Sequence, residues 1–161
     1  MAIVAGFDVH RAQITFDALA QETGEVKRGR IRATPKAVRA WAEAFAGAEV
    51  HVAVEAGTGW LFVCEALTKA GAVAHLAEPV ETSALRGRKR RAKTDREDAR
   101  WLRELLADGR LPESWIPPEH LLELRARVRL RHTLVDQRRE WQQRMQAVLY
   151  HHGVPPRAWL L

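Results

Sequence analysis

The amino-acid pattern indicates an α/β fold: a mixed five-stranded sheet with flanking helices, followed by a long helical arm. Three features support this expectation. Residues 2–32 contain three strand-like segments joined by short turns, residues 34–77 alternate helical and strand-like segments, and residues 119–151 show one long helical pattern. Strands that alternate with helices favour right-handed crossovers, and therefore parallel pairing.

The first three strands should form an antiparallel meander. Residues 2–9 are an apolar run with β-branched side chains, which is typical of a buried strand. Residues 13–20 alternate apolar and polar side chains, and residues 22–25 supply a turn. Residues 26–32 form a polar strand, which we expect at an edge of the sheet because charge there discourages aggregation.

Helices and strands then alternate along the chain. A helix over residues 34–47 begins with a threonine cap and a proline at its first position. Residues 50–54 form a buried strand, residues 60–70 a helix and residues 72–77 a further strand. This order of elements is that of the ribonuclease H-like (RuvC-like) fold. In that fold the first strand lies beside the strand that follows the first helix.

The chain divides into three expected parts. Residues 1–110 form the sheet domain, and residues 111–118 contain three prolines and act as a linker. Residues 119–161 form a helical arm. Apolar positions of the arm fit a heptad, although Arg131 and Arg138 fall in the same seam, so we expect a coiled-coil hairpin or a dimerisation arm. Its apolar end lacks a closing element and suggests a truncated chain.

Composition narrows the class of protein. With 161 residues, 47% of them hydrophobic, the chain should fold as about one domain with an appended element. Its net charge of +6 favours polyanionic partners. Cys64 is the single cysteine, which excludes an internal disulfide and a zinc cluster of cysteines. Apolar runs are far shorter than the roughly 20 residues of a membrane span, so a cytoplasmic protein without membrane contact is expected.

Four carboxylates are candidates for a catalytic metal site. Asp8 lies near the end of the first strand, and Glu55 ends the strand after the first helix. Asp95 and Asp98 are three residues apart, which places both on one face of a first helical turn capped by Thr94. Four converging carboxylates repel one another, and divalent cations remove that conflict.

Oxygen ligands without a thiolate partner favour Mg²⁺ or Mn²⁺. Two such ions about 4 Å apart would stabilise the attacking and leaving oxygens of a phosphodiester transfer. The alternative is structural, because acidic residues in a first helical turn suit the helix dipole. Asp8 could be a turn residue and Glu55 a cap. His10, two residues past Asp8, could position a phosphate or simply be exposed.

A basic run, residues 86–93, stands directly before Asp95 and suits a loop that binds phosphates, although it could also be a solvated loop. Further positive charge lies along the long helix, and Trp115 is a candidate for stacking on a base. The residues expected to contact nucleic acid are Arg86, Arg88, Lys89, Arg90, Arg91, Lys93, Arg125 and Arg129.

Three ordered motifs carry a family resemblance. They are residues 6–10 (Gly-Phe-Asp-Val-His), residues 54–59 (Val-Glu-Ala-Gly-Thr-Gly) and residues 93–99 (Lys-Thr-Asp-Arg-Glu-Asp-Ala). They resemble the signature of insertion-sequence transposases with a RuvC-like Asp-Glu-Asp-Asp domain, the recombinases guided by a bridge RNA. The resemblance covers nearly the whole chain. It implies a RuvC-like domain to about Asp108, followed by a coiled-coil region.

By that resemblance, the acidic metal-binding and catalytic residues would be Asp8, Glu55, Asp95 and Asp98. The implied partners are DNA, a bridge RNA and further copies of the chain, as a dimer or as a tetramer with nucleic acid. The family also has a C-terminal domain with a nucleophilic serine. Ser83 and Ser114 do not lie in such a domain, so we expect an N-terminal part of the transposase.

Three functional hypotheses remain open. The leading one is the metal-binding and nucleic-acid-binding part of a transposase that acts in transposition by DNA strand cleavage and exchange. The second is a stand-alone, metal-dependent junction resolvase or nuclease on the same fold. The third is a non-catalytic module that binds RNA and dimerises, whose carboxylates merely cap helices.

Overall fold

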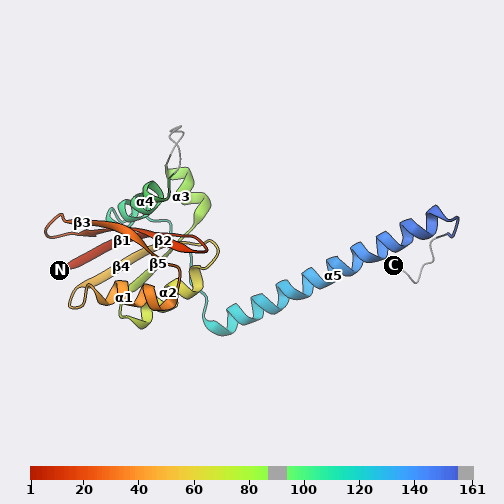
Figure 1. Ribbon diagram of the computed structural model, residues 1–161, viewed down its shortest axis with the longest axis horizontal. Helices are drawn as coiled ribbons and strands as arrows, with labels where there is room; N and C mark the ends of the chain where they lie inside the picture. The colour runs from red at the N-terminus through yellow and green to blue at the C-terminus, as the bar shows by residue number, and fades with distance from the viewer. Residues whose placement is uncertain (87–93, 156–161) are drawn as a thin grey trace. The chain divides into compact units, whose positions relative to one another are not determined.

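The computed structural model describes residues 1–86 and 94–155 (Figure 1). The chain divides into two compact units, Met1–Trp115 and Ile116–Leu161. The first unit contains a mixed five-stranded sheet with helices on both faces, as predicted from the sequence. The second unit contains one long helix, α5 (Glu119–His151).

The sheet has the strand order β3-β2-β1-β4-β5. Three antiparallel strands come first: β1 (Ala2–Val9), β2 (Gln13–Ala20) and β3 (Val26–Arg32). On the other side of β1, β4 (Glu49–Glu55) and then β5 (Val73–Ala77) pair in parallel. The predicted meander and the predicted neighbourhood of the first and fourth strands are therefore both present.

The register between β1 and β4 decides which side chains share a face. Phe7 lies opposite Val54, and one residue further along both strands come Asp8 and Glu55. Successive side chains of a strand point to opposite faces of a sheet. Phe7 and Val54 therefore share one face, and Asp8 and Glu55 share the other.

One face of the sheet carries the main hydrophobic core. Here α1 (Pro35–Glu43) and α2 (Trp60–Lys69) cover β1 and β4, as Figure 1 shows. Phe7 and Val54 are fully buried beneath them. The ring of Trp41 packs edge-on against Phe7, with 4.7 Å between the ring centroids. This packing holds the ends of β1 and β4 side by side.

The other face is covered by α4 (Asp95–Ala107). A Cβ atom at Gly6 would overlap the carbonyl oxygen of Ala99 and lie 2.6 Å from the backbone nitrogen of Arg103. Only glycine therefore lets the helix approach β1 so closely. Leu102 packs against Ala53 on the same face. The close approach brings the first turn of α4 toward the end of β1.

A buried ion pair also fastens α4 to the sheet. Asp17 of β2 is 2% exposed, and its Oδ1 lies 2.6 Å from Nε of Arg103, whose side chain is 9% exposed. Arg28 of β3 donates from Nε to Oδ2 of Asp17 over 2.6 Å. A buried carboxylate is costly unless it is paired, and here two guanidinium groups pair with it.

One helix of the first unit was not predicted. The strand β5 ends at Ala77, and the Glu78-Pro79 pair that follows opens a short helix, α3 (Pro79–Leu85). The carboxylate of Glu78 accepts a hydrogen bond from the Glu81 amide over 2.6 Å, so Glu78 acts as an N-cap and proline takes the first helical position. The pair therefore both ends the strand and starts a helix.

The proline-containing segment after α4 is not a free connection. Ala77 at the end of β5 forms an antiparallel bridge with Glu113. The Ser114 amide donates to the Leu76 carbonyl over 2.7 Å, and the Glu78 amide donates to the Pro112 carbonyl over 2.8 Å. These bonds hold residues 112–114 along the edge of β5.

Candidate metal centre

The centre begins with Asp8, a buried carboxylate at the end of β1. Its Oδ2 lies 3.1 Å from Nε2 of His10, and the same nitrogen lies 3.5 Å from Oδ1 of Asp95. Asp8, His10 and Asp95 each offer one ligand atom, and these atoms all lie within 4.8 Å of one another. This group could therefore hold a metal ion.

The start of α4 supplies the second part of the centre. Thr94 is the N-cap, and its Oγ1 accepts a hydrogen bond from the Glu97 amide over 3.3 Å, as the sequence predicted. Asp95 and Asp98 both lie in the first turn of the helix. The side chain of Asp98 is 14% exposed, whereas that of Asp95 is 38% exposed. The capped turn thus presents one half-open and one mostly buried carboxylate.

Electrostatics tie these carboxylates together. Burial raises the pKa of Asp8 above its ordinary value, and the negative charges of Asp98 and Asp95 raise it further. The neighbouring His10 lowers it. The charge of Asp8 is thus disfavoured both by its surroundings and by two acids of α4. A cation bound between Asp8, Asp95 and Asp98 would reduce this electrostatic repulsion.

Glu55 stands slightly apart from that group. It ends β4 half-buried, and the strand register places it beside Asp8 on the face that α4 covers. Among the described residues, the candidate ligands within 4.8 Å of one another are Asp8, His10 and Asp95. The structure therefore brings Asp8 and Asp95 together, with Asp98 close enough to act on Asp8 and Glu55 on the adjacent strand.

His10 is the member that the sequence did not assign as a ligand. The only feature of the sequence that points to His10 is its position two residues after Asp8. That position alone does not distinguish a metal ligand from an exposed histidine. The β1 backbone ends at Val9, and the ring of His10 turns back toward the carboxylates. An imidazole is thus available both as a ligand and as a hydrogen-bond donor.

Arginines supply positive charge around the acids. Arg86, just after α3, forms an ion pair with Asp98, and its guanidinium lies 5.9 Å from the ring centroid of Trp101. Nη2 of Arg30 on β3 lies 4.0 Å from Oδ2 of Asp95. Arg86 was predicted to contact nucleic acid; in this structure it contacts a predicted metal ligand. The other predicted residues of the basic run lie outside the described residues: Arg88, Lys89, Arg90, Arg91 and Lys93.

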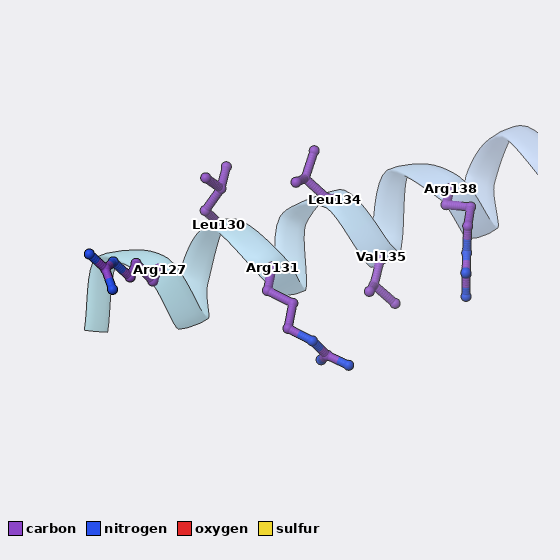
Figure 2. Close-up of a pocket in the computed structure, with 6 residues that line it drawn as sticks. All are labelled: Arg127, Leu130, Arg131, Leu134, Val135 and Arg138. Atoms are coloured by element: carbon purple, nitrogen blue, oxygen red, sulfur yellow. The ribbon is translucent and has the colours of Figure 1, made fainter. Parts of the chain in front are cut away.

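The second unit carries the remaining predicted contacts. Arg125 and Arg129 lie on the exposed surface of α5, a helix in which no residue is buried. Figure 2 shows a shallow groove along this helix, where Leu130 and Leu134 point to one side and Arg131 to the other. The residues that line the groove are Arg127, Leu130, Arg131, Leu134, Val135 and Arg138. Apolar and cationic side chains are thus interleaved on α5.

Comparison with known proteins adds one match. The family model for the DEDD transposases of the IS110 type, described as "Transposase", matches residues 5–153. The matched region includes all four predicted acids and spans most of the chain. No curated protein matches the chain. In the described part of the chain, every helix is too short or too polar to cross a membrane.

Proposed function

Since the chain belongs to the IS110-type family of DEDD transposases, we propose that it forms the metal-binding and nucleic-acid-binding part of a transposase. The observation that carries this proposal is the meeting of Asp8 and Asp95 at one nitrogen of His10. These acids come from the first strand and from a helix late in the first unit. Family membership supports a role in transposition. DNA strand cleavage and exchange guided by a bridge RNA are the finer steps that we propose.

The donor set fits a divalent cation such as Mg²⁺ or Mn²⁺. Asp8, Asp95 and Asp98 supply hard carboxylate oxygens, and Glu55 can complete the set from β4. Burial, together with the charges of Asp98 and Asp95, raises the pKa of Asp8, so a cation beside this carboxylate would favour its charged form. A bound divalent ion would supply Lewis-acid stabilisation of the phosphodiester oxygens. The proposed part of the protein is to hold four oxygen donors around the ion, two from the ends of β1 and β4 and two from the first turn of α4.

The basic side chains of the centre have a second proposed task. Arg86 and Arg30 compensate Asp98 and Asp95 in this structure. A cation bound to these carboxylates removes the electrostatic reason for the arginines to stay there. The released guanidinium groups can then bind phosphate oxygens of the nucleic acid, for which their fork of N–H donors is well suited. Arg86 would thus link metal loading to substrate binding.

Nucleic-acid contacts are also proposed outside the centre. In the first unit they involve Arg86 and the remaining basic residues of the run up to Lys93, and in the second unit Arg125 and Arg129 of α5. Contacts of this kind with DNA or a guide RNA hold the backbone without reading its sequence. Binding should therefore weaken steeply with salt, because each neutralised phosphate releases counterions.

We also propose that α5 associates with the α5 helix of a second copy of the chain. The helix exposes large apolar side chains, including Leu124, Val128 and Met145, which are 55%, 46% and 49% exposed. They recur along the helix at heptad positions, where a second helix would bury them. Arginines within the seam would favour a dimer that opens or rearranges when it binds nucleic acid.

Binding of nucleic acid by the full chain tests the proposed function. The protein is titrated into a labelled four-way DNA junction, and separately into a structured RNA, in the presence of either Mg²⁺ or a chelator. We expect Mg²⁺ to strengthen DNA binding by the wild-type chain and to have little effect on the double variant Asp95→Asn/Asp98→Asn. Glu97→Gln is the matched control, because Glu97 is an exposed acid in the same helical turn.

The same experiment separates the alternative functions. Junction cleavage by this chain alone with Mg²⁺ would favour a stand-alone nuclease. If RNA binding and its salt dependence are unchanged in the double variant, and Mg²⁺ has no effect on the wild type, the carboxylates only cap helices. That outcome would overturn the proposed metal-dependent role.

A further inference from the structure

A second cluster of titratable side chains lies away from the carboxylate centre. Nδ1 of His51 on β4 and Nε2 of His75 on β5 are 2.9 Å apart. The outer nitrogen of each ring faces a carboxylate: His51 Nε2 lies 3.0 Å from Glu49, and His75 Nδ1 lies 2.9 Å from Glu113. His51 is four residues before Glu55 on the same strand, about 13 Å along it.

The positions of the hydrogen atoms in this row of four side chains, Glu49, His51, His75 and Glu113, can be worked out. An ionised carboxylate only accepts hydrogen bonds, so the outer nitrogen of each histidine must carry the hydrogen. In two neutral imidazoles, the inner nitrogens of His51 and His75 then both present lone pairs to each other. The two nitrogen atoms are 2.9 Å apart, so their facing lone pairs repel each other unless a positive charge lies between them.

We propose that His51 and His75 form a second cation site, for a nitrogen-preferring transition metal ion such as Zn²⁺. Zn–N bonds of about 2.0–2.1 Å in a tetrahedral arrangement place two ligand nitrogens roughly 3.3–3.4 Å apart. The observed separation of 2.9 Å would have to widen by a few tenths of an ångström, and the two rings, which face each other end to end with centroids 5.2 Å apart, would have to tilt so that both lone pairs meet at the ion. Neutral imidazole is a ligand that zinc favours, whereas Mg²⁺ prefers oxygen.

The surroundings of the two rings match this role. A histidine that binds a metal usually donates its other N–H to a carboxylate, which fixes the tautomer and the ring orientation. Glu49 and Glu113 stand in that position for His51 and His75. The histidine side chains are 28% and 18% exposed, so water can reach the remaining coordination positions.

Occupation of the site would have a structural consequence. Glu113 belongs to the segment that pairs with the edge of β5 and precedes α5 in the chain. A cation between the imidazoles strengthens the hydrogen bond from His75 to Glu113, because the metal makes the ring N–H a better donor. Zinc would therefore hold residues 112–114 more firmly on β5, next to the Ser114 and Glu78 amide bonds.

The test uses the full chain and measures the response of individual residues at the site by NMR. Zn²⁺ is added at mildly alkaline pH, where free imidazoles are neutral. Ring ¹⁵N resonances of His51 and His75 and hydrogen exchange of the Ser114 and Glu78 amides are followed by NMR. We expect the ring resonances to shift and the exchange of both amides to slow several-fold, with no such effect from Mg²⁺.

Variants assign the effect. His75→Asn and His51→Asn should abolish the slowing by zinc. Glu113→Gln, which keeps the ring ligands, should weaken zinc binding by roughly tenfold or more. Two control variants should respond as the wild type does: Asp8→Asn/Asp95→Asn, which lacks the carboxylate centre, and His151→Gln/His152→Gln, which lacks the other adjacent histidine pair.

Two outcomes would overturn the proposal. One is unchanged His51 and His75 ring resonances when zinc is present, which would mean that a proton alone lies between the rings. The other is undiminished zinc protection of Ser114 in His75→Asn. Should the histidine variants fail to fold, the wild-type resonances and Glu113→Gln decide the question.

Discussion

Asp8 and Asp95 contact the same atom, the Nε2 nitrogen of His10, at 3.1 and 3.5 Å. One strand end and one helix start therefore converge on a single imidazole. At most one positive charge on that ring faces two carboxylates, with Asp98 acting on Asp8 as well. Asp8 and Asp98 are largely buried, and Arg86 and Arg30 pair with Asp98 and Asp95, so the repulsion falls mainly on Asp8.

Removing the charge of Asp8 should stabilise the metal-free protein. Burial raises the pKa of folded Asp8 above the ordinary value of 3.8. The stability that this group contributes is therefore full below that value and is lost as the pH rises through the folded pKa. At neutral pH with a chelator, Asp8→Asn should have a higher Tm than the wild type in calorimetry, and Glu97→Gln should change it little. A lower Tm for Asp8→Asn would show that its hydrogen bond with His10 outweighs the burial of its charge.

Metal affinity should depend on pH through the same group. A proton on Asp8 competes with the cation, and the raised pKa extends that competition to higher pH than for an exposed aspartate. We expect Mn²⁺ affinity to fall as the pH is lowered. Calorimetry in two buffers of different ionisation enthalpy measures the protons released. Proton release that persists unchanged in Asp8→Asn would assign it to another group.

A methyl group at Gly6 should disturb both the fold and the centre. The added Cβ would overlap backbone atoms of Ala99 and Arg103, so α4 must move away from β1. We expect Gly6→Ala to lower the free energy of unfolding by about 1–3 kcal/mol, measured in urea, and to weaken Mn²⁺ binding. Gly57→Ala is the matched control, because a Cβ at Gly57 meets nothing within 4 Å. Equal stability of the two variants would contradict the close packing of α4.

Self-association through α5 should respond to charge in its apolar seam. Val135→Lys places an ammonium group at a heptad position that a partner helix would bury, between Arg131 and Arg138 of the same seam, and burying a further like charge there is unfavourable. Sedimentation should show a dimer for the wild-type chain and a monomer, or a much weaker dimer, for Val135→Lys. Gln137→Lys adds the same charge at an exposed position beside it and should leave the mass unchanged. A monomeric wild-type chain would rule out this role for α5.

Much of the sheet could be predicted because its elements have local signals. Alternating apolar and polar residues defined β2, and a threonine cap defined the start of α4. The pairing of β1 with β4 followed from the order of elements alone. Since Asp8 and Glu55 end these two strands, their adjacency could be predicted as well.

Other features depend on contacts that no local pattern encodes. The alternation in β2 puts Asp17 on a polar face, and it does not show that α4 covers that face and pairs Arg103 with Asp17. The bridge from Glu113 to β5 rests on backbone hydrogen bonds between distant segments. The helix α3 was missed because Glu78 acts through its side chain as a cap, a role that its residue type does not favour strongly.

The most direct test of the central claim is calorimetric titration of the full chain with Mn²⁺. If Asp8, Asp95 and Asp98 share a cation, the wild type binds Mn²⁺, Asp95→Asn/Asp98→Asn loses that binding while remaining folded, and Glu97→Gln binds as the wild type does. The same Mn²⁺ affinity in the folded double variant as in the wild type would contradict it.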